Sequence, residues 1–301
     1  MLTIGSRGSQ LALWQARWIQ SRLAALGEEA RIEIIHTTGD KITDVPLSKV
    51  GTKGLFTKEI EEALLRGDID VAVHSLKDMP TELPDGLTLA AIPEREDPRD
   101  ALVGRRWDEL VEGARVGTSS LRRAAQLRAH RQDLVIETIR GNVDTRVRKL
   151  DEGQYEAIVL ASAGLRRLGL DGRIAEVLDP DFMCPAVGQG ALAVETRADN
   201  GRALQLCGRL DDANTRTAVT AERAVLATLG GGCQVPIGAH AVVDGRAVKM
   251  DAVVVAPDGA CIIRRNARGE ASEARAIGQR LGEELLTAGA REILDEVYGR
   301  S

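Results

Sequence analysis

Residues 115–123 read Arg115-Val116-Gly117-Thr118-Ser119-Ser120-Leu121-Arg122-Arg123. The stretch Arg115–Gly117 has the character of a strand end, and a serine side chain that follows it is well suited to cap the first free N–H groups of a helix. We expect Ser119 or Ser120 to begin a helix that runs to about His130. A strand followed directly by a helix is the repeating unit of layered α/β proteins.

The same alternation of apolar strands and helices continues on both sides of this stretch. Further strands are expected at Leu2–Gly5, Arg31–Thr37, Ile69–His74, Leu134–Ile139 and Glu156–Ala161. Helices are expected from about Ser9 (with Leu11, Trp14, Trp18 and Leu23 on one face), over Thr57–Arg66, from Asn142 and from Gly164. The prolines and charges of Pro93–Pro98 indicate a linker, and Leu192–Thr196 is expected to return to the first sheet as a strand.

From about Asp212 the pattern changes to that of a small α+β domain. We expect a helix at Thr217–Leu229, strands at Ala239–Val243, Ala247–Val255 and Ala260–Arg268, and a final helix at Glu270–Leu286. With 301 residues the chain is long enough for two or three domains.

Composition excludes several classes of protein. The chain is 44% hydrophobic and 28% charged, as in soluble globular proteins, and no apolar run has the length of a membrane span. A net charge of −5 and only 2% aromatic residues argue against a nucleic-acid partner. The strand-like N-terminus lacks a signal-peptide core, and the four cysteines are widely spaced without a CxxC pair. We therefore expect a cytoplasmic protein without disulfides or a metal site.

Basic residues recur just after predicted strands, at the loop or first turn of the next helix. In an open α/β sheet these positions line one crevice, where helix N-termini and arginine forks both favour anions. The pattern predicts a polyanionic ligand held between two domains, although any single arginine, taken alone, is better explained as a solvated surface charge. The arginines at these junctions are Arg7, Arg122, Arg123, Arg140, Arg146, Arg166 and Arg167, and Lys49, Lys53 and Lys58 add positive charge from the first domain.

A Lys77–Asp78 pair follows the strand predicted at Ile69–His74. An aspartate at such a strand end, near arginines, is held as a carboxylate that can accept a hydrogen bond from a substrate or stabilise a cation. A turn or capping role for Asp78 fits the residues equally well.

Cys233 lies among three glycines in Leu229-Gly230-Gly231-Gly232-Cys233-Gln234-Val235-Pro236-Ile237-Gly238. Glycine permits sharp turns, so this loop can present the thiol to a large partner. Taken alone, a buried structural cysteine is the commoner case.

Eight segments in this order resemble the porphobilinogen deaminase family. Three small departures are Gln10, where a proline is expected, Thr52, where a glycine is expected, and Gly230, where an acidic residue is expected. The matching segments are Ser9–Gln15, Lys49–Phe56, His74–Pro80, Glu94–Asp100, Gly117–Arg123, Arg140–Arg146, Pro185–Gly190 and Gly231–Gly238.

The resemblance implies two α/β domains like those of periplasmic binding proteins, with a cleft between them, and a small α+β C-terminal domain. The expected boundaries are 1–94 with 191–211, then 95–190, then 212–301. It also implies an enzyme that deaminates four porphobilinogen molecules and joins them head to tail into the linear tetrapyrrole hydroxymethylbilane. The implied primer is a dipyrromethane cofactor, bound through a thioether to Cys233.

The resemblance further assigns roles to individual residues. Asp78 matches the catalytic carboxylate that stabilises cationic pyrroles and assists proton transfer. The residues implied to hold the cofactor are Cys233, Lys77, Asp78, Thr118, Ser119, Ser120, Arg122, Arg123, Arg140, Arg146 and Gln189. Those implied to bind substrate are Arg7, Ser9, Lys49, Lys53, Phe56, Arg140, Arg146 and Arg167.

Two other classes of protein remain open. A non-enzymatic anion-binding protein would share the first two domains, and a thiol enzyme would use Cys233 as a redox or acyl nucleophile. A domain that presents a thiol counts against the anion-binding protein. The absence of a recognisable partner base or resolving cysteine counts against the thiol enzyme. We expect a monomer, since no heptad or apolar patch is visible, and the polar loop Asp40–Lys53 is a candidate lid.

Overall fold

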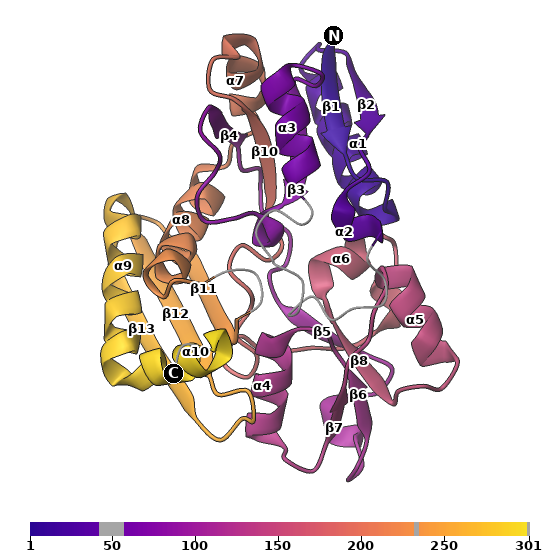
Figure 1. Cartoon of the computed structure of the whole chain (residues 1–301), viewed down its shortest axis with the longest axis vertical. Coiled ribbons are helices and arrows are strands. Elements are labelled where there is room, and N and C mark those ends of the chain that lie inside the picture. The colour runs from indigo at the N-terminus through magenta and orange to yellow at the C-terminus, as the bar shows by residue number, and fades with distance from the viewer. Residues whose placement is uncertain (42–56, 232–234, 300–301) are drawn as a thin grey trace. The chain divides into compact units, whose positions relative to one another are not determined.

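The computed structural model describes residues 1–41, 57–231 and 235–299. Its backbone divides into two compact units, Met1–Glu96 with Gly190–Arg216 and Asp97–Gln189 with Thr217–Ser301. One sheet belongs to the first unit and two belong to the second (Figure 1).

The sheet of the first unit has the strand order β2-β1-β3-β10-β4. Strands β1, β2 and β3 are parallel, and β10 runs antiparallel to both of its neighbours. The predicted return of the chain through residues 192–196 is thereby confirmed. The strands are β1 (Leu2–Ser6), β2 (Ala30–Ile34), β3 (Val71–Ser75), β4 (Leu87–Ala91) and β10 (Leu192–Arg197).

Helix α1 (Gln10–Ala25) is capped by Ser9, as predicted, but of the residues expected on its apolar face Leu23 is buried whereas Leu11, Trp14 and Trp18 are only partly buried. Its buried positions are Ala12, Gln15, Ala16, Ile19 and Leu23. Small alanine side chains let the helix approach the sheet closely, whereas the tryptophans are only partly buried at its flanks. The other helices of this unit are α2 (Thr38–Lys41), α3 (Lys58–Arg66), the short turn η2 (Leu76–Asp78) and α7 (Gly201–Gly208).

The first sheet of the second unit has the order β7-β6-β8-β5-β9. Here β6, β7 and β8 are parallel and β5 is antiparallel, so both five-stranded sheets follow one plan. The strands are β5 (Asp100–Val103), β6 (Arg115–Gly117), β7 (Val135–Glu137), β8 (Ala157–Ala161) and β9 (Ile174–Val177). The helical segments are η3 (Trp107–Glu109), α4 (Leu121–His130), α5 (Val143–Asp151), α6 (Ser162–Arg167) and η4 (Asp171–Arg173).

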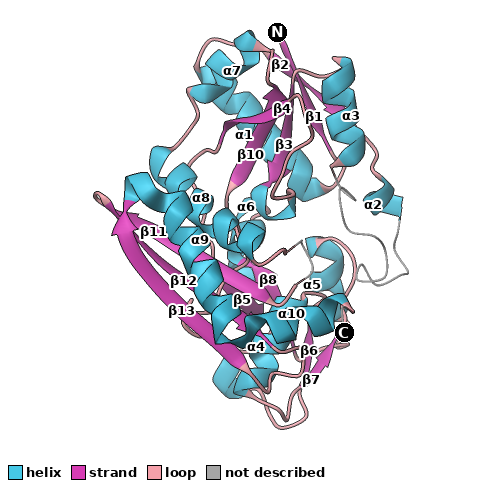
Figure 2. Ribbon diagram, turned by 60° about the vertical axis from the view of Figure 1, so that its left-hand side comes forward, coloured by secondary structure: helices cyan, strands magenta, loops and turns pink. Residues whose placement is uncertain are grey.

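The third sheet is antiparallel, in the order β11-β12-β13. Its inner face packs against α8 and α9, and the other face contacts α4 through Val253 and Val255 (Figure 2). The elements are α8 (Ala213–Thr228), β11 (Ile237–Asp244), β12 (Ala247–Val255), β13 (Ile262–Glu270), η5 (Ala271–Glu273), α9 (Ala274–Leu285), the π-turn η6 (Leu286–Ala290) and α10 (Arg291–Tyr298).

Two details of the C-terminal region differ from expectation. Helix α8 begins four residues earlier than predicted, and a further helix, α10, follows the one that we expected to be final. Gly289, with φ +103°, breaks the helix between α9 and α10 in a conformation that residues with a side chain rarely adopt. The predicted fold class, two α/β sheets and a small C-terminal α+β region, is confirmed. In the described part of the chain no helix is both long and apolar enough to cross a membrane.

Candidate functional site

In the first unit, predicted site residues gather at the carboxyl edge of the sheet. Strands β1 and β3 are parallel neighbours, so the segments that follow them lie at the same edge. Arg7 and Ser9 follow β1, and Lys77 and Asp78 form the end of η2, which follows β3. Ser9 caps α1: its Oγ accepts the N–H of Ala12 at 3.3 Å.

We call residues Ser75–Met79 the Asp78 turn. Ser75 Oγ accepts a hydrogen bond from Gln15 Nε2 at 2.8 Å, and Leu76 N–H donates to the carbonyl of Ala191 at 3.0 Å. The side chains of Leu76 and Met79 are buried. Lys77 is half-buried between these anchors and Asp78 is exposed. A turn fixed on both sides thus presents an accessible carboxylate.

In the second unit, the parallel strands β6, β7 and β8 bring a second set of predicted residues to one edge. Thr118, Ser119 and Ser120 follow β6, and Arg140 lies shortly after β7. Ser120 caps α4 by accepting the N–H of Arg123 at 3.4 Å, and Ser119 donates to the carbonyl of Ile139. Helices α4 and α5 begin at this edge, so their N-terminal N–H groups favour an anion there.

Arg122 and Arg123 are buried and share one carboxylate, Asp100, that sequence reasoning missed. Arg122 Nη1 lies 2.8 Å from Asp100 Oδ2, and Arg123 reaches Oδ1 through Nε at 3.0 Å and Nη2 at 2.7 Å. Burial opposes ionisation of Asp100, but the two guanidinium groups outweigh it and hold the pKa of that carboxyl well below its ordinary value. An acidic residue directly before the apolar run of β5 was the available signal.

Gln189 belongs to the same network. Its Nε2 donates to Asp100 Oδ1 at 2.8 Å and to the carbonyl of Pro98 at 2.7 Å. Arg123 Nη1 also donates to the carbonyl of Val159 at 3.1 Å, so all three of its guanidinium nitrogens face protein oxygens. Gln189 and Arg123 therefore support the site through hydrogen bonds to other protein groups. Arg123 contributes its positive charge to the site, because its N–H groups already donate to protein oxygens.

Arg122, Arg123, Arg140 and Arg146 form what we call the arginine cluster. Burial, then the positive charges of Arg123 and Arg140, lower the pKa of Arg146 to about 10. A group that is harder to keep protonated because of its cationic neighbours gains most from an incoming anion. The arrangement is thus suited to carboxylates or phosphates. Within the described ranges, no group of His, Cys, Asp or Glu is arranged to hold a metal ion.

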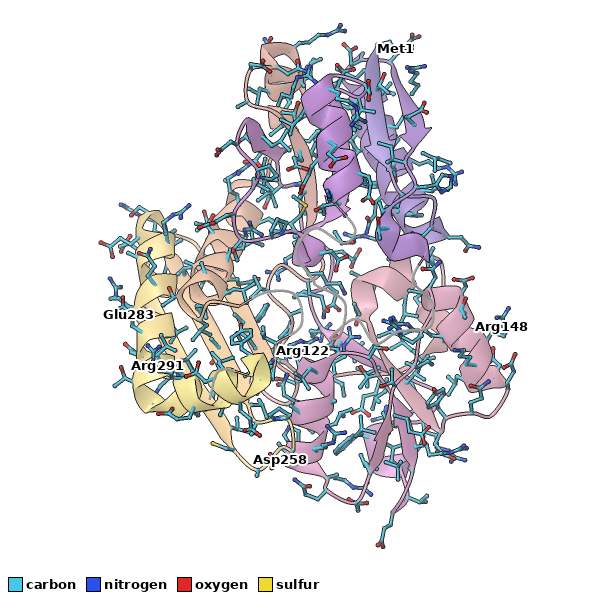
Figure 3. The ribbon with its side chains drawn as sticks, in the orientation of Figure 1. Met1, Arg122, Arg148, Asp258, Glu283 and Arg291 are labelled. Atoms are coloured by element: carbon cyan, nitrogen blue, oxygen red, sulfur yellow. The ribbon has the colours of Figure 1, made fainter. Side chains whose placement is uncertain are left out.

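Other basic residues at this edge have different surroundings. Arg167 is buried at the end of α6, and Arg166 lies 3.1 Å from Asp97. Lys149 Nζ donates to the carbonyl of Arg140 at 3.2 Å, which supports the loop before α5. Arg148 projects from the outer side of α5, where it lies 3.6 Å from Glu152 (Figure 3). Arg148 is thus the surface charge of this group.

The cysteines separate into inert and accessible thiols. Cys184 and Cys207 are buried, and burial raises the pKa of each to about 12, so neither forms a reactive thiolate. Cys261 is exposed in the connection between β12 and β13. Cys233, Lys49, Lys53 and Phe56 lie outside the described residues, as does most of the loop expected to be a lid.

Comparisons with known proteins match almost the whole chain. Residues 2–205 match the family model described as "Porphobilinogen deaminase, dipyromethane cofactor binding domain", and residues 216–287 match "Porphobilinogen deaminase, C-terminal domain". The porphobilinogen deaminase of Pelobacter propionicus is 52% identical over 99% of this chain and 98% of its own length. That of Syntrophotalea carbinolica is 54% identical over 97% of this chain and 95% of its own length.

Solved structures are more distant. A periplasmic substrate-binding protein of an ABC transporter from Coxiella burnetii is 15% identical, with a TM-score of 0.44, over 70% of this chain and 91% of that chain. At that TM-score the two backbones differ too much for the likeness to bear on fold or function. The two family models and relatives more than half identical over nearly the full length show the family of this chain. The chain belongs to the porphobilinogen deaminase family, the hydroxymethylbilane synthases, which are transferases of tetrapyrrole and heme biosynthesis that use a dipyrromethane cofactor.

Proposed function

We propose that this chain deaminates four porphobilinogen molecules and joins them head to tail into hydroxymethylbilane. The observation that carries the proposal is the arginine cluster, in which burial, and then the positive charges of Arg123 and Arg140, lower the pKa of Arg146. Each porphobilinogen unit bears an acetate and a propionate group, so a growing chain accumulates negative charge. A site in which cations repel one another is stabilised by each carboxylate that enters it.

We also propose that the dipyrromethane cofactor is bound by this edge of the second unit and by the Asp78 turn. Its acidic side chains fit the arginine cluster and the N-termini of α4 and α5. When bound, it supplies the pyrrole unit on which the product chain is built. Cys233 is the proposed thioether attachment point because its loop matches that of the family. Cys184 and Cys207 are buried and unreactive, and the exposed Cys261 serves as the control in the test of this assignment. The proposed contacts are Lys77, Asp78, Thr118, Ser119, Ser120, Arg122, Arg123, Arg140, Arg146 and Gln189.

Asp78 is the proposed catalytic residue. The protonated aminomethyl group of porphobilinogen leaves as neutral ammonia, which takes the electron pair of the broken C–N bond and leaves a methylene-pyrrole cation. A carboxylate beside the pyrrole N–H stabilises that cation. After the new C–C bond forms, a ring carbon must lose a proton, and the same carboxylate assists that transfer. The exposed position of Asp78 on a fixed turn is compatible with both tasks.

The remaining proposals concern substrate and organisation. Arg7, Ser9, Arg140, Arg146 and Arg167 are proposed to bind substrate, with Lys49, Lys53 and Phe56 from the segment outside the described residues. The domains are proposed at 1–94 with 191–211, 95–190 and 212–301. We propose a cytoplasmic monomer.

Arg146→Gln is expected to raise the KM for porphobilinogen and to lower kcat/KM about 10- to 100-fold, as for the loss of one charge-assisted hydrogen bond. Arg148→Gln is the matched control: Arg148 lies in the same helix, two residues further along, but projects outward beside Glu152. Steady-state rates of both variants against substrate concentration measure the effect. Equal KM values for the two variants would remove Arg146 from the binding site.

The proposed function is tested by incubating the purified protein with porphobilinogen. We expect one ammonia released per porphobilinogen consumed and a linear tetrapyrrole as the product, measured by an ammonia assay and by mass spectrometry. Tight binding of porphobilinogen without turnover would instead support a non-enzymatic anion-binding protein. A freely titratable Cys233 in an active preparation would support a thiol enzyme.

A further inference from the structure

A histidine and two glutamates are buried together in the first unit. His74 lies on β3, Glu195 on β10 and Glu61 on α3, and their exposed fractions are 6%, 0% and 7%. His74 Nε2 lies 3.1 Å from Glu195 Oε2. Buried ionisable groups are costly unless they are paired, so such a cluster needs an explanation beyond packing.

Glu61 is the weak acid of this cluster. Burial raises the pKa of Glu61, the negative charge of Glu195 raises it further, and Thr57 and His74 act in the opposite sense. Glu61 Oε1 and Glu195 Oε1 are both buried without a hydrogen-bond partner among the described residues. A proton on Glu61 removes one of two buried negative charges and leaves Glu195 as the partner of His74.

The cluster is joined directly to the Asp78 turn. His74 is the residue before the turn, and its side chain is held by Glu195 of β10. Ala191, the residue directly before β10, also holds the turn, because its carbonyl accepts a hydrogen bond from the N–H of Leu76. The end of β3 is therefore tied to the β10 segment by the backbone ladder that pairs His74 with Ala193, by the Leu76–Ala191 hydrogen bond and by the His74–Glu195 side-chain contact, immediately before Asp78.

We propose that His74 and Glu195 form a positioning pair for Asp78. Glu61 is the third member of the cluster, and as a neutral acid it adds no second negative charge beside that of Glu195. The proposal rests on the proposed catalytic role of Asp78. His74 is a positioning residue: it acts through the backbone of the Asp78 turn and does not touch substrate. Displacement of a catalytic group by about 1 Å can cost about 10²-fold in rate.

The test compares His74→Ala with His74→Gln and with Thr196→Val as a matched control. Thr196 neighbours Glu195, is equally buried, and donates from Oγ1 to the carbonyl of Asp70 at 2.7 Å, at the opposite end of β3. For His74→Ala we expect kcat to fall about 10- to 100-fold with KM within about threefold. His74→Gln keeps a donor near Nε2 and should recover about tenfold of that loss. Thr196→Val should lower Tm but leave kcat unchanged.

The outcomes separate the two proposals. If His74→Ala keeps the kcat of Thr196→Val, the positioning role is overturned even where Asp78→Asn is inactive. If Asp78→Asn itself is active, the catalytic assignment fails first, whatever His74→Ala does. In the double variant with Asp78→Asn, His74→Ala should cause no further loss of kcat, because it acts only through Asp78. A further tenfold loss there would overturn the proposal.

Glu61→Gln tests the retained proton. The folded-state pKa of Glu61 lies above its ordinary value of 4.5, so the native protein loses stability as pH rises through the folded pKa, while the amide variant does not. The Tm of Glu61→Gln minus that of the native protein should therefore increase as pH is raised above about 4.5. A Tm difference that is constant, or falls with pH, would overturn the protonated state of Glu61.

Discussion

Asp78→Asn is expected to fold like the native protein and to lose about 10³-fold or more of its turnover. The amide has the size of the carboxylate but carries no charge, so it neither stabilises a methylene-pyrrole cation nor accepts the proton that must leave. Asp78 is exposed on its turn, so the fold does not depend on its side chain being packed. Steady-state ammonia release and Tm, measured on the same preparation, report the two properties separately.

The control for this variant is Asp85→Asn. Asp85 is also exposed, in the same unit and seven residues further along, but it lies outside the Asp78 turn. Its removal should leave turnover within about twofold, since exposed charges away from a site change little. Turnover by Asp78→Asn above a tenth of the native rate would take Asp78 out of the mechanism.

Cys233→Ser is expected to carry no covalent pyrrole and to be inactive. A thiolate is a far stronger nucleophile than a neutral hydroxyl, so the thioether cannot be replaced by an ether under the same conditions. Intact-mass measurement should show the native chain heavier than its sequence by two linked pyrrole units. The serine variant should show the mass of the polypeptide alone.

Cys261→Ser is the matched control, because Cys261 is the exposed cysteine of the described part of the chain. It should keep both the added mass and the activity. An adduct that survives in Cys233→Ser but not in Cys261→Ser would move the attachment to Cys261. A native mass that stays equal to the polypeptide after incubation with porphobilinogen would contradict covalent attachment altogether.

Local patterns in the sequence were sufficient for much of the fold. The strand Arg115–Gly117 and the helix Leu121–His130 lie where they were predicted, and Gly67 ends α3 in a left-handed conformation (φ +80°). Alternation of apolar residues, serine caps and glycine stops act within a few residues of one another, so they can be recognised without knowing the fold. The gathering of Arg7 with Asp78, and of Ser120 with Arg140, at strand ends then follows from parallel pairing.

Contacts between distant residues could only be found in the tertiary structure. Asp100 meets Arg123 across 23 residues, and His74 meets Glu195 across 121. The buried face of α1 was also predicted wrongly except at Leu23. Ala12 and Ala16 pack against the sheet because they are small, which a pattern of large apolar residues does not reveal. Sequence determined which residues reach the carboxyl edge of each sheet, since that depends on local strand and helix signals. Only the packing of the tertiary structure decided which of these charges pair with one another. A buried charge is costly unless an opposite charge lies next to it, and the sequence does not show which residues become neighbours.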